Sequence, residues 1–179
     1  MTTAAEDRTL ILVRHAEAVD RSPDGDHERE LTERGMAQAE EAGRWLHEHG
    51  IGVDEALCST AARARQTAEG LWAGGCPEAE VHHLRQLYNG SSEAILAVLR
   101  EADPDANVVM VVGHAPGIPA LASVLADGEG SAAAHRALAE GFPPCGMAVL
   151  TYQGHWRDLG AEDATLTRLH LTTIDAAIG

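Results

Sequence analysis

The stretch Leu10-Ile11-Leu12-Val13-Arg14-His15-Ala16-Glu17 joins a continuous apolar run to an arginine and a histidine. An apolar run that is bounded in this way predicts a buried strand. Open α/β sheets bind their ligands at the carboxyl ends of their strands, which is where Arg14 and His15 stand. An arginine beside a histidine is common, so the interpretation depends on how the later apolar runs end.

Two later runs end in polar residues in the same way. The segment 56–58 leads into Ser59-Thr60, which we expect to cap a helix over 61–71 that carries Arg63 in its first turn. The run 108–112 is the strongest strand signal of the chain, and Gly113-His114 follows it directly. Parallel strands place their carboxyl ends on one edge of a sheet, so we expect Arg14, His15, Arg63 and His114 to converge.

The remaining pattern alternates strands with helices. Thr32 offers an N-cap for an amphipathic helix that stops at Gly50, and Pro116-Gly117 open another helix. The other expected elements are a loop over 19–30, a strand near 81–84, a helix over 93–101, a loop with some helical content over 127–146, and closing strands over 147–152 and 166–171. This order predicts an α/β three-layer sandwich with a mostly parallel sheet, built as a single domain over 1–179 with a flexible amino terminus at 1–8.

The composition of the chain excludes several classes of function. The chain has 28 acidic and 13 basic residues among 179 and a formal net charge of -15, which argues against nucleic-acid binding. An anion would therefore need a local positive pocket. Cys58, Cys76 and Cys145 show neither a disulfide framework nor a zinc spacing. The first apolar run is too short for a signal peptide or a membrane span, so we expect a cytoplasmic protein that does not bind a membrane.

Two arginines and two histidines around one point suit a phosphoryl group. Guanidinium groups match phosphate oxygens bidentately, and a neutral imidazole can attack phosphorus in line. Histidine has an unperturbed pKa near 6.5, so we expect His15 to titrate close to neutrality, with nearby arginines favouring its neutral form. If the arginines and His114 neutralise the phosphoryl oxygens, the reaction needs no metal and no other cofactor.

These residues resemble the histidine phosphatase superfamily, which has the phosphoglycerate mutase-like fold. The resemblance rests on four ordered motifs, which are Leu12-Val13-Arg14-His15-Ala16-Glu17, Leu31-Thr32-Glu33-Arg34-Gly35, Ser59-Thr60-Ala61-Ala62-Arg63-Ala64-Arg65-Gln66-Thr67-Ala68 and Val111-Val112-Gly113-His114. It implies that His15 accepts the phosphoryl group and that Arg14, Arg63 and His114 complete the phosphate pocket.

The chain departs from the family pattern at two places. Ala16 replaces the usual glycine after the histidine, and residues 85–92 contain no acid where many members insert a general acid. Short members without this acid resemble the SixA-type phosphohistidine phosphatases. A positioned acid is typically worth about 10²- to 10⁴-fold for a basic leaving group, but an imidazole with a pKa of ~6.5 needs it less. We therefore expect a preference for phosphohistidine over phosphomonoesters.

Other polar residues allow two interpretations. Arg29 could reach an anionic substrate or brace the first loop, and Glu17 could serve the site or pair with a nearby arginine. Tyr88, Ser91 and Ser92 border the expected entrance, and Arg65 points to another side of its helix. The pairs His47 and His49, and His82 and His83, are read as surface residues and not as a metal site.

The leading hypothesis is a metal-independent phosphatase that acts through His15 on phosphohistidine in proteins, and its expected partner is a phosphorylated protein or a small phosphorylated substrate. A phosphatase for a small metabolite or nucleotide is the second, and a catalytically silent module that binds a phosphorylated ligand is the third. The sequence assigns no oligomeric state.

Overall fold

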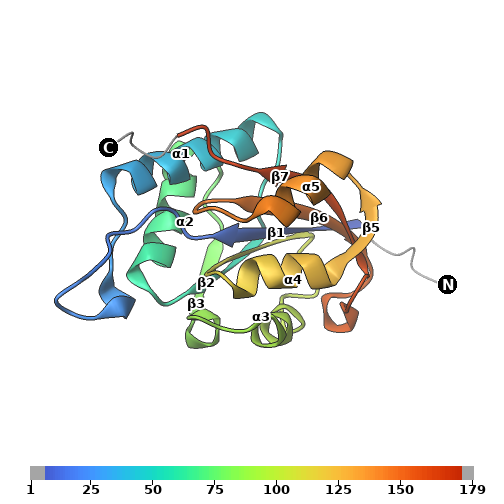
Figure 1. Cartoon of the computed structure of the whole chain (residues 1–179). Coiled ribbons are helices and arrows are strands. Elements are labelled where there is room, and N and C mark those ends of the chain that lie inside the picture. Colours follow the sequence, from blue (N-terminus) through green and yellow to red (C-terminus); the bar gives the residue numbers. More distant parts are fainter. Residues whose placement is uncertain (1–6, 175–179) are drawn as a thin grey trace.

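The computed structural model describes residues 7–174 and centres on one seven-stranded sheet (Figure 1). Its strands are β1 (Asp7–Arg14), β2 (Glu55–Ser59), β3 (Glu80–Leu84), β4 (Val108–Gly113), β5 (Ala126–Gly130), β6 (Met147–Gln153) and β7 (Ala164–His170). Its α-helices are α1 (Glu33–Glu48), α2 (Ala62–Gly74), α3 (Ser92–Leu99), α4 (Gly117–Leu125) and α5 (Ala132–Glu140). Three short 3-10 helices are η1 (Asp26–Glu28), η2 (Arg85–Leu87) and η3 (Trp156–Asp158).

The sheet has the strand order β3-β2-β4-β1-β6-β7-β5. The first four of these strands are mutually parallel, β6 runs antiparallel to both β1 and β7, and β5 is parallel to β7. Arg14 at the end of β1 stands opposite Gly113 at the end of β4, and Cys58 in β2 stands opposite Val112. The carboxyl ends of β1, β2 and β4 therefore share one edge of the sheet, as expected.

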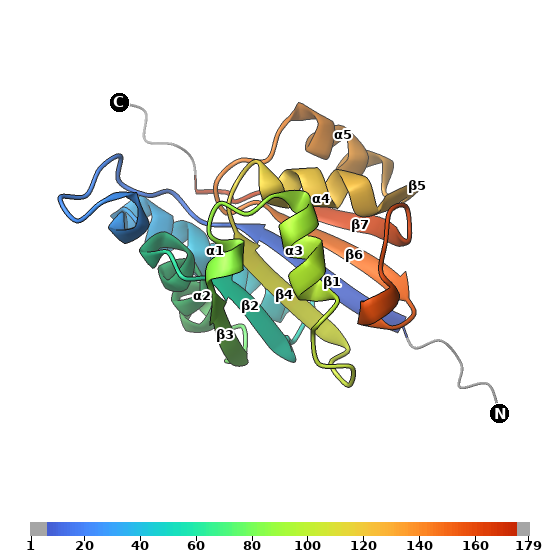
Figure 2. The same cartoon turned by 90° about the horizontal axis from the view of Figure 1, so that it is seen from below.

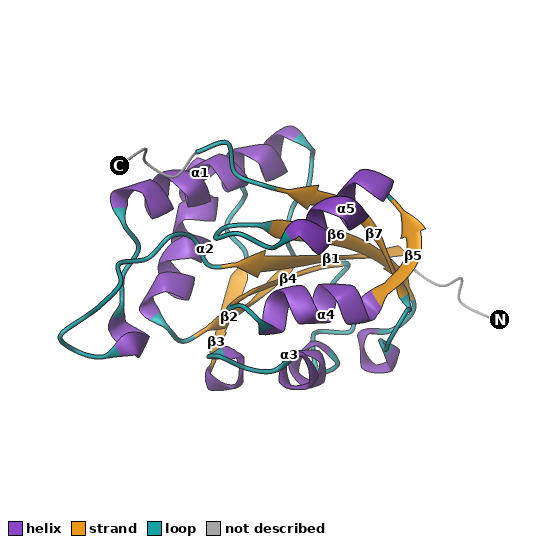
Figure 3. Ribbon diagram, in the orientation of Figure 1, coloured by secondary structure: helices purple, strands orange, loops and turns teal. Residues whose placement is uncertain are grey.

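Helices cover both faces of the sheet, which confirms the three-layer α/β fold (Figure 3). Alternate residues of a strand point to opposite faces. Leu10 and Leu12 pack in one cluster with apolar residues of α3, α4 and α5, whereas Ile11 and Val13 pack with α1 and α2. Figure 2 shows α3 and α4 in front of the sheet. Because β1 is buried on both faces, its sequence is a continuous apolar run rather than an alternating one.

Local capping agrees with the sequence for α1 but not for α2. The Thr32 hydroxyl accepts a hydrogen bond from the Gly35 amide, which confirms Thr32 as the N-cap of α1. The N-cap of α2 is Ala61 and makes no side-chain cap. The predicted cap from Ser59-Thr60 is wrong: the Thr60 hydroxyl contacts His27, and the Ser59 hydroxyl contacts His114 and the amide of Ala61, which is itself the N-cap.

Two boundaries also differ from expectation. The segment 127–146 contains most of the edge strand β5 and all of α5, and β5 escaped prediction because Ala-Asp-Gly-Glu-Gly has no strand pattern and is mostly exposed. The flexible terminus expected over 1–8 is too long, because Asp7 and Arg8 belong to β1 and the Arg8 side chain is buried. Residues 1–6 of that prediction lie outside the described residues.

Within residues 7–174, no helix combines the length and the apolar character that a membrane crossing requires.

Candidate active site

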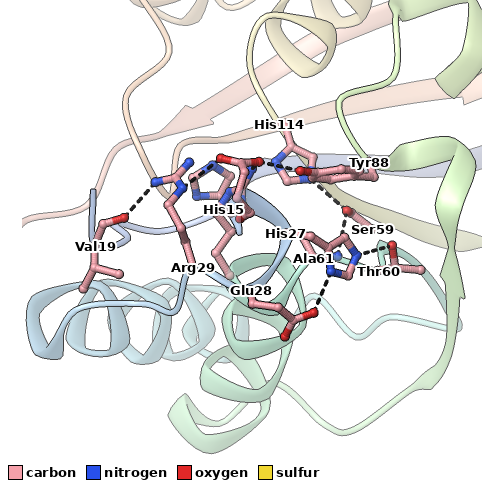
Figure 4. Close-up of polar contacts among 12 residues, drawn as sticks. His15, Val19, His27, Glu28, Arg29, Ser59, Thr60, Ala61, Tyr88 and His114 are labelled. Carbon is pink, nitrogen blue, oxygen red and sulfur yellow. Dashed lines mark hydrogen bonds and ion pairs between the residues drawn. The ribbon is translucent and has the colours of Figure 1, made fainter. Parts of the chain in front are cut away.

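One pocket at the carboxyl edge of the sheet brings together the four residues that the sequence singled out. Arg14, His15, Arg63 and His114 all line it, in a cavity of about 320 Å³. The rings of His15 and His114 lie close together, with 5.2 Å between their centroids and a tilt of 59° (Figure 4). Parallel strand order therefore joins residues that are far apart in the chain.

His15 lines the pocket with one ring nitrogen unprotonated, so the lone pair of that nitrogen is available. Its Nδ1 lies 2.7 Å from the backbone oxygen of Ala16, and a carbonyl oxygen can only accept a hydrogen bond. Nδ1 therefore carries the hydrogen, and Nε2 of the neutral ring is unprotonated. Burial, together with the charges of Arg63 and Arg14, lowers the pKa of His15 to about 4 against the opposing effect of the Ala16 contact. His15 is thus neutral at physiological pH, with a pKa well below the near-neutral value expected from the sequence, because that value left out burial.

His114 is oriented by the fully buried Ser59. The Nε2 atom of His114 lies 2.8 Å from Ser59 Oγ, which also accepts the Ala61 amide hydrogen at 3.2 Å (Figure 4). Among the described residues, His114 Nε2 is the acceptor within reach of the buried Ser59 hydroxyl, so we assign the hydroxyl hydrogen to this bond, which leaves the ring hydrogen on Nδ1. Burial, His15 and Arg63 lower the pKa of His114 to about 3, so this ring is also neutral.

Three buried nitrogen donors at the pocket lack a partner. Within residues 7–174, Nε of Arg14, Nε of Arg63 and Nδ1 of His114 are buried without a hydrogen-bond acceptor. Buried donors of this kind are normally satisfied, because leaving one unpaired costs roughly 1 to 3 kcal/mol. A ligand with several anionic oxygens would supply the missing acceptors.

An acidic residue that the sequence analysis missed reaches the same pocket. Asp26 in η1 accepts hydrogen bonds from Arg29 and Arg63 through its carboxylate, and a third from the Tyr88 hydroxyl. The Tyr88 hydrogen bond, followed by the Arg29 hydrogen bond and the charges of Arg63 and Arg29, holds the pKa of Asp26 well below its ordinary value. Its loop has no periodic pattern, and the single available signal was an acid three residues before Arg29.

Comparison with known proteins agrees with this geometry. The family model of the histidine phosphatase superfamily (branch 1) matches residues 10–93. An uncharacterized protein of Mycobacterium tuberculosis is 38% identical over 162 residues, which are 89% of this chain and 99% of that protein. The chain belongs to the histidine phosphatase superfamily.

Solved structures of this superfamily place the chain in its SixA-type branch. A proposed phosphohistidine phosphatase SixA from Nakamurella multipartitia is 38% identical, with a TM-score of 0.84 over 96% of this chain and 99% of the other. Its counterpart from Agrobacterium tumefaciens is 30% identical, with a TM-score of 0.74 over 92% and 98%. The family match and the similarity to these SixA structures together identify the chain as a phosphatase, and the phosphoglycerate mutase-like fold is confirmed.

The superfamily motifs also hold the backbone of the site. Thr67 in α2 accepts the Ala16 amide hydrogen at 3.0 Å and donates to the Arg63 carbonyl oxygen, so α2 fixes the turn after His15. Gln66 accepts the Leu31 amide hydrogen at 2.7 Å. A Cβ at Gly35 would overlap the backbone oxygen of Glu17, so the helix start of α1 needs a glycine there. Thr67, Gln66 and Gly35 hold the backbone around the pocket without lining it.

Of the other polar residues for which the sequence allowed two interpretations, some have structural contacts, some line the pocket, and some have both. Arg29 braces the loop, since it donates to the Val19 backbone oxygen at 2.8 Å (Figure 4) and to Asp26 Oδ1 at 2.9 Å. It also lines the pocket. Glu17 lines the pocket as well, but its carboxylate pairs with Arg34 at 3.0 Å, as the structural alternative predicted. Arg65 is exposed, as expected.

Tyr88 lies edge-on to His114, with 5.6 Å between ring centroids, whereas Ser91 caps α3. The paired histidines are exposed, and they are His47, His49, His82 and His83. Across residues 7–174, no cluster of three or more histidine, cysteine or acidic side chains is placed to hold a metal ion. Cys58, Cys76 and Cys145 are buried free thiols.

Proposed function

We propose that this phosphatase hydrolyses phosphohistidine in proteins through a phosphoenzyme on His15, without a metal ion. The observation that carries the proposal is the unprotonated Nε2 of His15 in a pocket with three unsatisfied buried donors. Arg14, Arg29 and Arg63 offer the positive charge that a metal would otherwise supply. The similarity to SixA structures supports the choice of substrate.

The proposed reaction has two displacements. In the first, the substrate is phosphohistidine with a proton on its second ring nitrogen: Nε2 of His15 attacks phosphorus, the substrate P–N bond breaks, and the imidazole leaves as a neutral ring that keeps the electron pair of that bond. In the second, water attacks phosphorus, the bond to Nε2 of His15 breaks, and inorganic phosphate forms. Arg14 and Arg63 hold the phosphoryl oxygens, and His114 donates through Nδ1. Arg29 contributes to phosphate binding, and Glu17 acts indirectly by holding Arg34.

The carboxylates at the pocket support a P–N substrate. Asp26 is ionised and hydrogen-bonded to Arg29, Arg63 and Tyr88, and Glu17 is paired with Arg34, so neither is poised to give a proton to an alkoxide. Residues 85–92 contain no acid either. A leaving imidazole is a far weaker base than an alkoxide, so the lack of a proton donor slows its departure less.

The cellular setting belongs to the same proposal. The three free cysteines suit a reducing cytoplasm, and a phosphorylated protein is the partner that an open phosphohistidine site requires.

The test compares a phosphohistidine peptide with a phosphoserine peptide and a small aryl phosphate, each with EDTA present. We expect turnover of phosphohistidine with a higher kcat/KM than either phosphomonoester, and an acid-labile phosphoenzyme after rapid quenching. His15→Ala should abolish both signals. The control is His83→Ala, which removes an exposed histidine of β3 and should leave turnover unchanged.

Equal or better turnover of the phosphomonoesters would contradict the P–N assignment and favour a small-molecule phosphatase. Loss of turnover with EDTA would point to a metal enzyme. If the wild type binds phosphohistidine but forms no phosphoenzyme and releases no phosphate, the chain is a binding module.

A further inference from the structure

The carboxylate of Asp26 joins three separate segments at the mouth of the phosphate pocket. Its Oδ1 accepts from Arg29 Nε at 2.9 Å, and its Oδ2 accepts from both Arg63 Nη2 at 3.2 Å and the Tyr88 hydroxyl. The backbone oxygen of Asp26 accepts from Arg63 Nη1 at 2.8 Å. Both terminal nitrogens of Arg63 therefore end on this one residue.

We infer that Asp26 is a positioning residue that orients Arg63, Arg29 and Tyr88 for phosphoryl transfer. The inference rests on the proposed function of the pocket. The side chain of Arg63 is 3% exposed, so its guanidinium has few alternative partners in place. With Nη1 and Nη2 held by Asp26, Nε of Arg63 stays free, buried and without an acceptor at the pocket. Tyr88, held by the same carboxylate, lies edge-on to His114.

The charge of the pocket gives Asp26 a second effect. Glu17 also lines the pocket, but its charge is balanced by the ion pair with Arg34. The guanidiniums of Arg14, Arg29 and Arg63 with the Asp26 carboxylate then leave two net positive charges, which match the roughly two negative charges of a phosphoryl group. Without the carboxylate, the nitrogens that it now occupies are free to bind the ligand. The phosphoryl group would then be bound at least as tightly but held in the wrong place for attack by His15.

A positioning role differs from proton transfer in its pH dependence. Hydrogen bonds from Tyr88 and the arginines keep the pKa of Asp26 far below the physiological range, so its charge is constant there. Removing it should lower the rate by the same factor at every pH from about 6 to 9. A general acid or base would change the shape of the profile.

The decisive variant is Asp26→Asn, which keeps the size of the side chain and removes its charge. The matched control is Asp24→Asn, which makes the same change at an exposed position of the same loop. We expect kcat on the substrate that the wild type hydrolyses to fall about 10- to 100-fold in Asp26→Asn, because small displacements of positioning groups cost up to about 10²-fold. The dissociation constant of inorganic phosphate, measured by titration calorimetry, should stay equal or become smaller. Asp24→Asn should match the wild type in both measurements.

Tyr88→Phe removes one of the three contacts and should lower kcat less, again without weakening phosphate binding. The inference is overturned if kcat of Asp26→Asn stays within about threefold of wild type, or if kcat and phosphate affinity fall together with the melting temperature, as for a merely structural residue. A wild type without turnover would contradict the proposed function instead. In that case the dissociation constant of inorganic phosphate tests the role of Asp26. Weaker binding by Asp26→Asn than by the wild type overturns the positioning role, and equal or tighter binding supports it.

Discussion

At the scale of single residues, the site depends on uncharged hydrogen-bond partners that determine which ring nitrogen of each histidine carries the hydrogen. The Ala16 carbonyl takes the Nδ1 hydrogen of His15, and Ser59 Oγ contacts Nε2 of His114. In the proposed reaction, the two contacts leave opposite nitrogens, Nε2 in one ring and Nδ1 in the other, for the phosphoryl group. A lone pair and a donor are the two functions that in-line attack on a phosphoryl group requires.

Ser59→Ala tests this assignment. Without the hydroxyl, nothing holds the hydrogen of His114 on Nδ1, so kcat should fall about 10- to 100-fold while KM changes little. The Ala61 amide also loses its acceptor, which should lower the free energy of unfolding by about 1 to 3 kcal/mol. Thr60→Ala is the control, because the Thr60 hydroxyl contacts His27 and not His114. Wild-type kcat in Ser59→Ala would contradict the role of the hydroxyl.

At the scale of elements, the close approach of α1 and α2 places Arg63. A Cβ at Gly43 in α1 would overlap the Leu71 carbonyl oxygen of α2, and one at Gly70 in α2 would meet the Ala39 side chain. The two helices can lie this close because small residues face each other. Since α2 carries both Arg63 and Thr67, its distance from α1 sets the position of the pocket wall.

Gly43→Ala should therefore destabilise the protein, although alanine favours a helix by about 1 kcal/mol over glycine. Overpacking of backbone against backbone should outweigh this gain and lower the free energy of unfolding by about 1 to 3 kcal/mol in urea denaturation. Gly52→Ala is the matched control, since a Cβ there meets nothing within 4 Å. Equal stability of the two variants would refute the proposed close contact.

At the scale of the whole molecule, the buried site makes folding depend on pH. His15 and His114 have pKa values near 4 and 3 in the folded protein, against about 6.5 in an unfolded chain. Between about pH 6.5 and 4 the unfolded chain binds protons that the folded site does not. The free energy of unfolding therefore falls as the pH drops through this window, and the contribution is complete above it.

The expected loss is on the order of a few kcal/mol between pH 7 and pH 4, read from urea denaturation at several pH values. The net charge of -15 acts in the opposite direction, because acid reduces repulsion among carboxylates, so the comparison must be made against a variant. His114→Gln should have a shallower slope of stability against pH than the wild type, and His83→Ala should keep the wild-type slope. Identical slopes in all three proteins would show that His114 is not buried in its neutral form.

Much of the site was predictable because its residues stand at the ends of strands. The apolar runs before Arg14 and before Gly113 identify buried parallel strands, and that alone brings Arg14, His15 and His114 to one edge. The strand β5 was not predictable, since its polar, exposed sequence pairs with β7 only through the completed sheet. The single-domain assignment over 1–179 stays a prediction.

The sequence by itself determined the layers of the fold, the family and the histidines of the pocket, because periodicity and short motifs are local properties of the chain. Only the tertiary structure decided how these groups are charged and held. Burial lowers the pKa of His15 and His114. The first loop places Asp26 in contact with Arg63, although the two residues are 37 positions apart in the sequence. Desolvation and contacts between distant segments exist only after the chain has packed, so no local pattern records them.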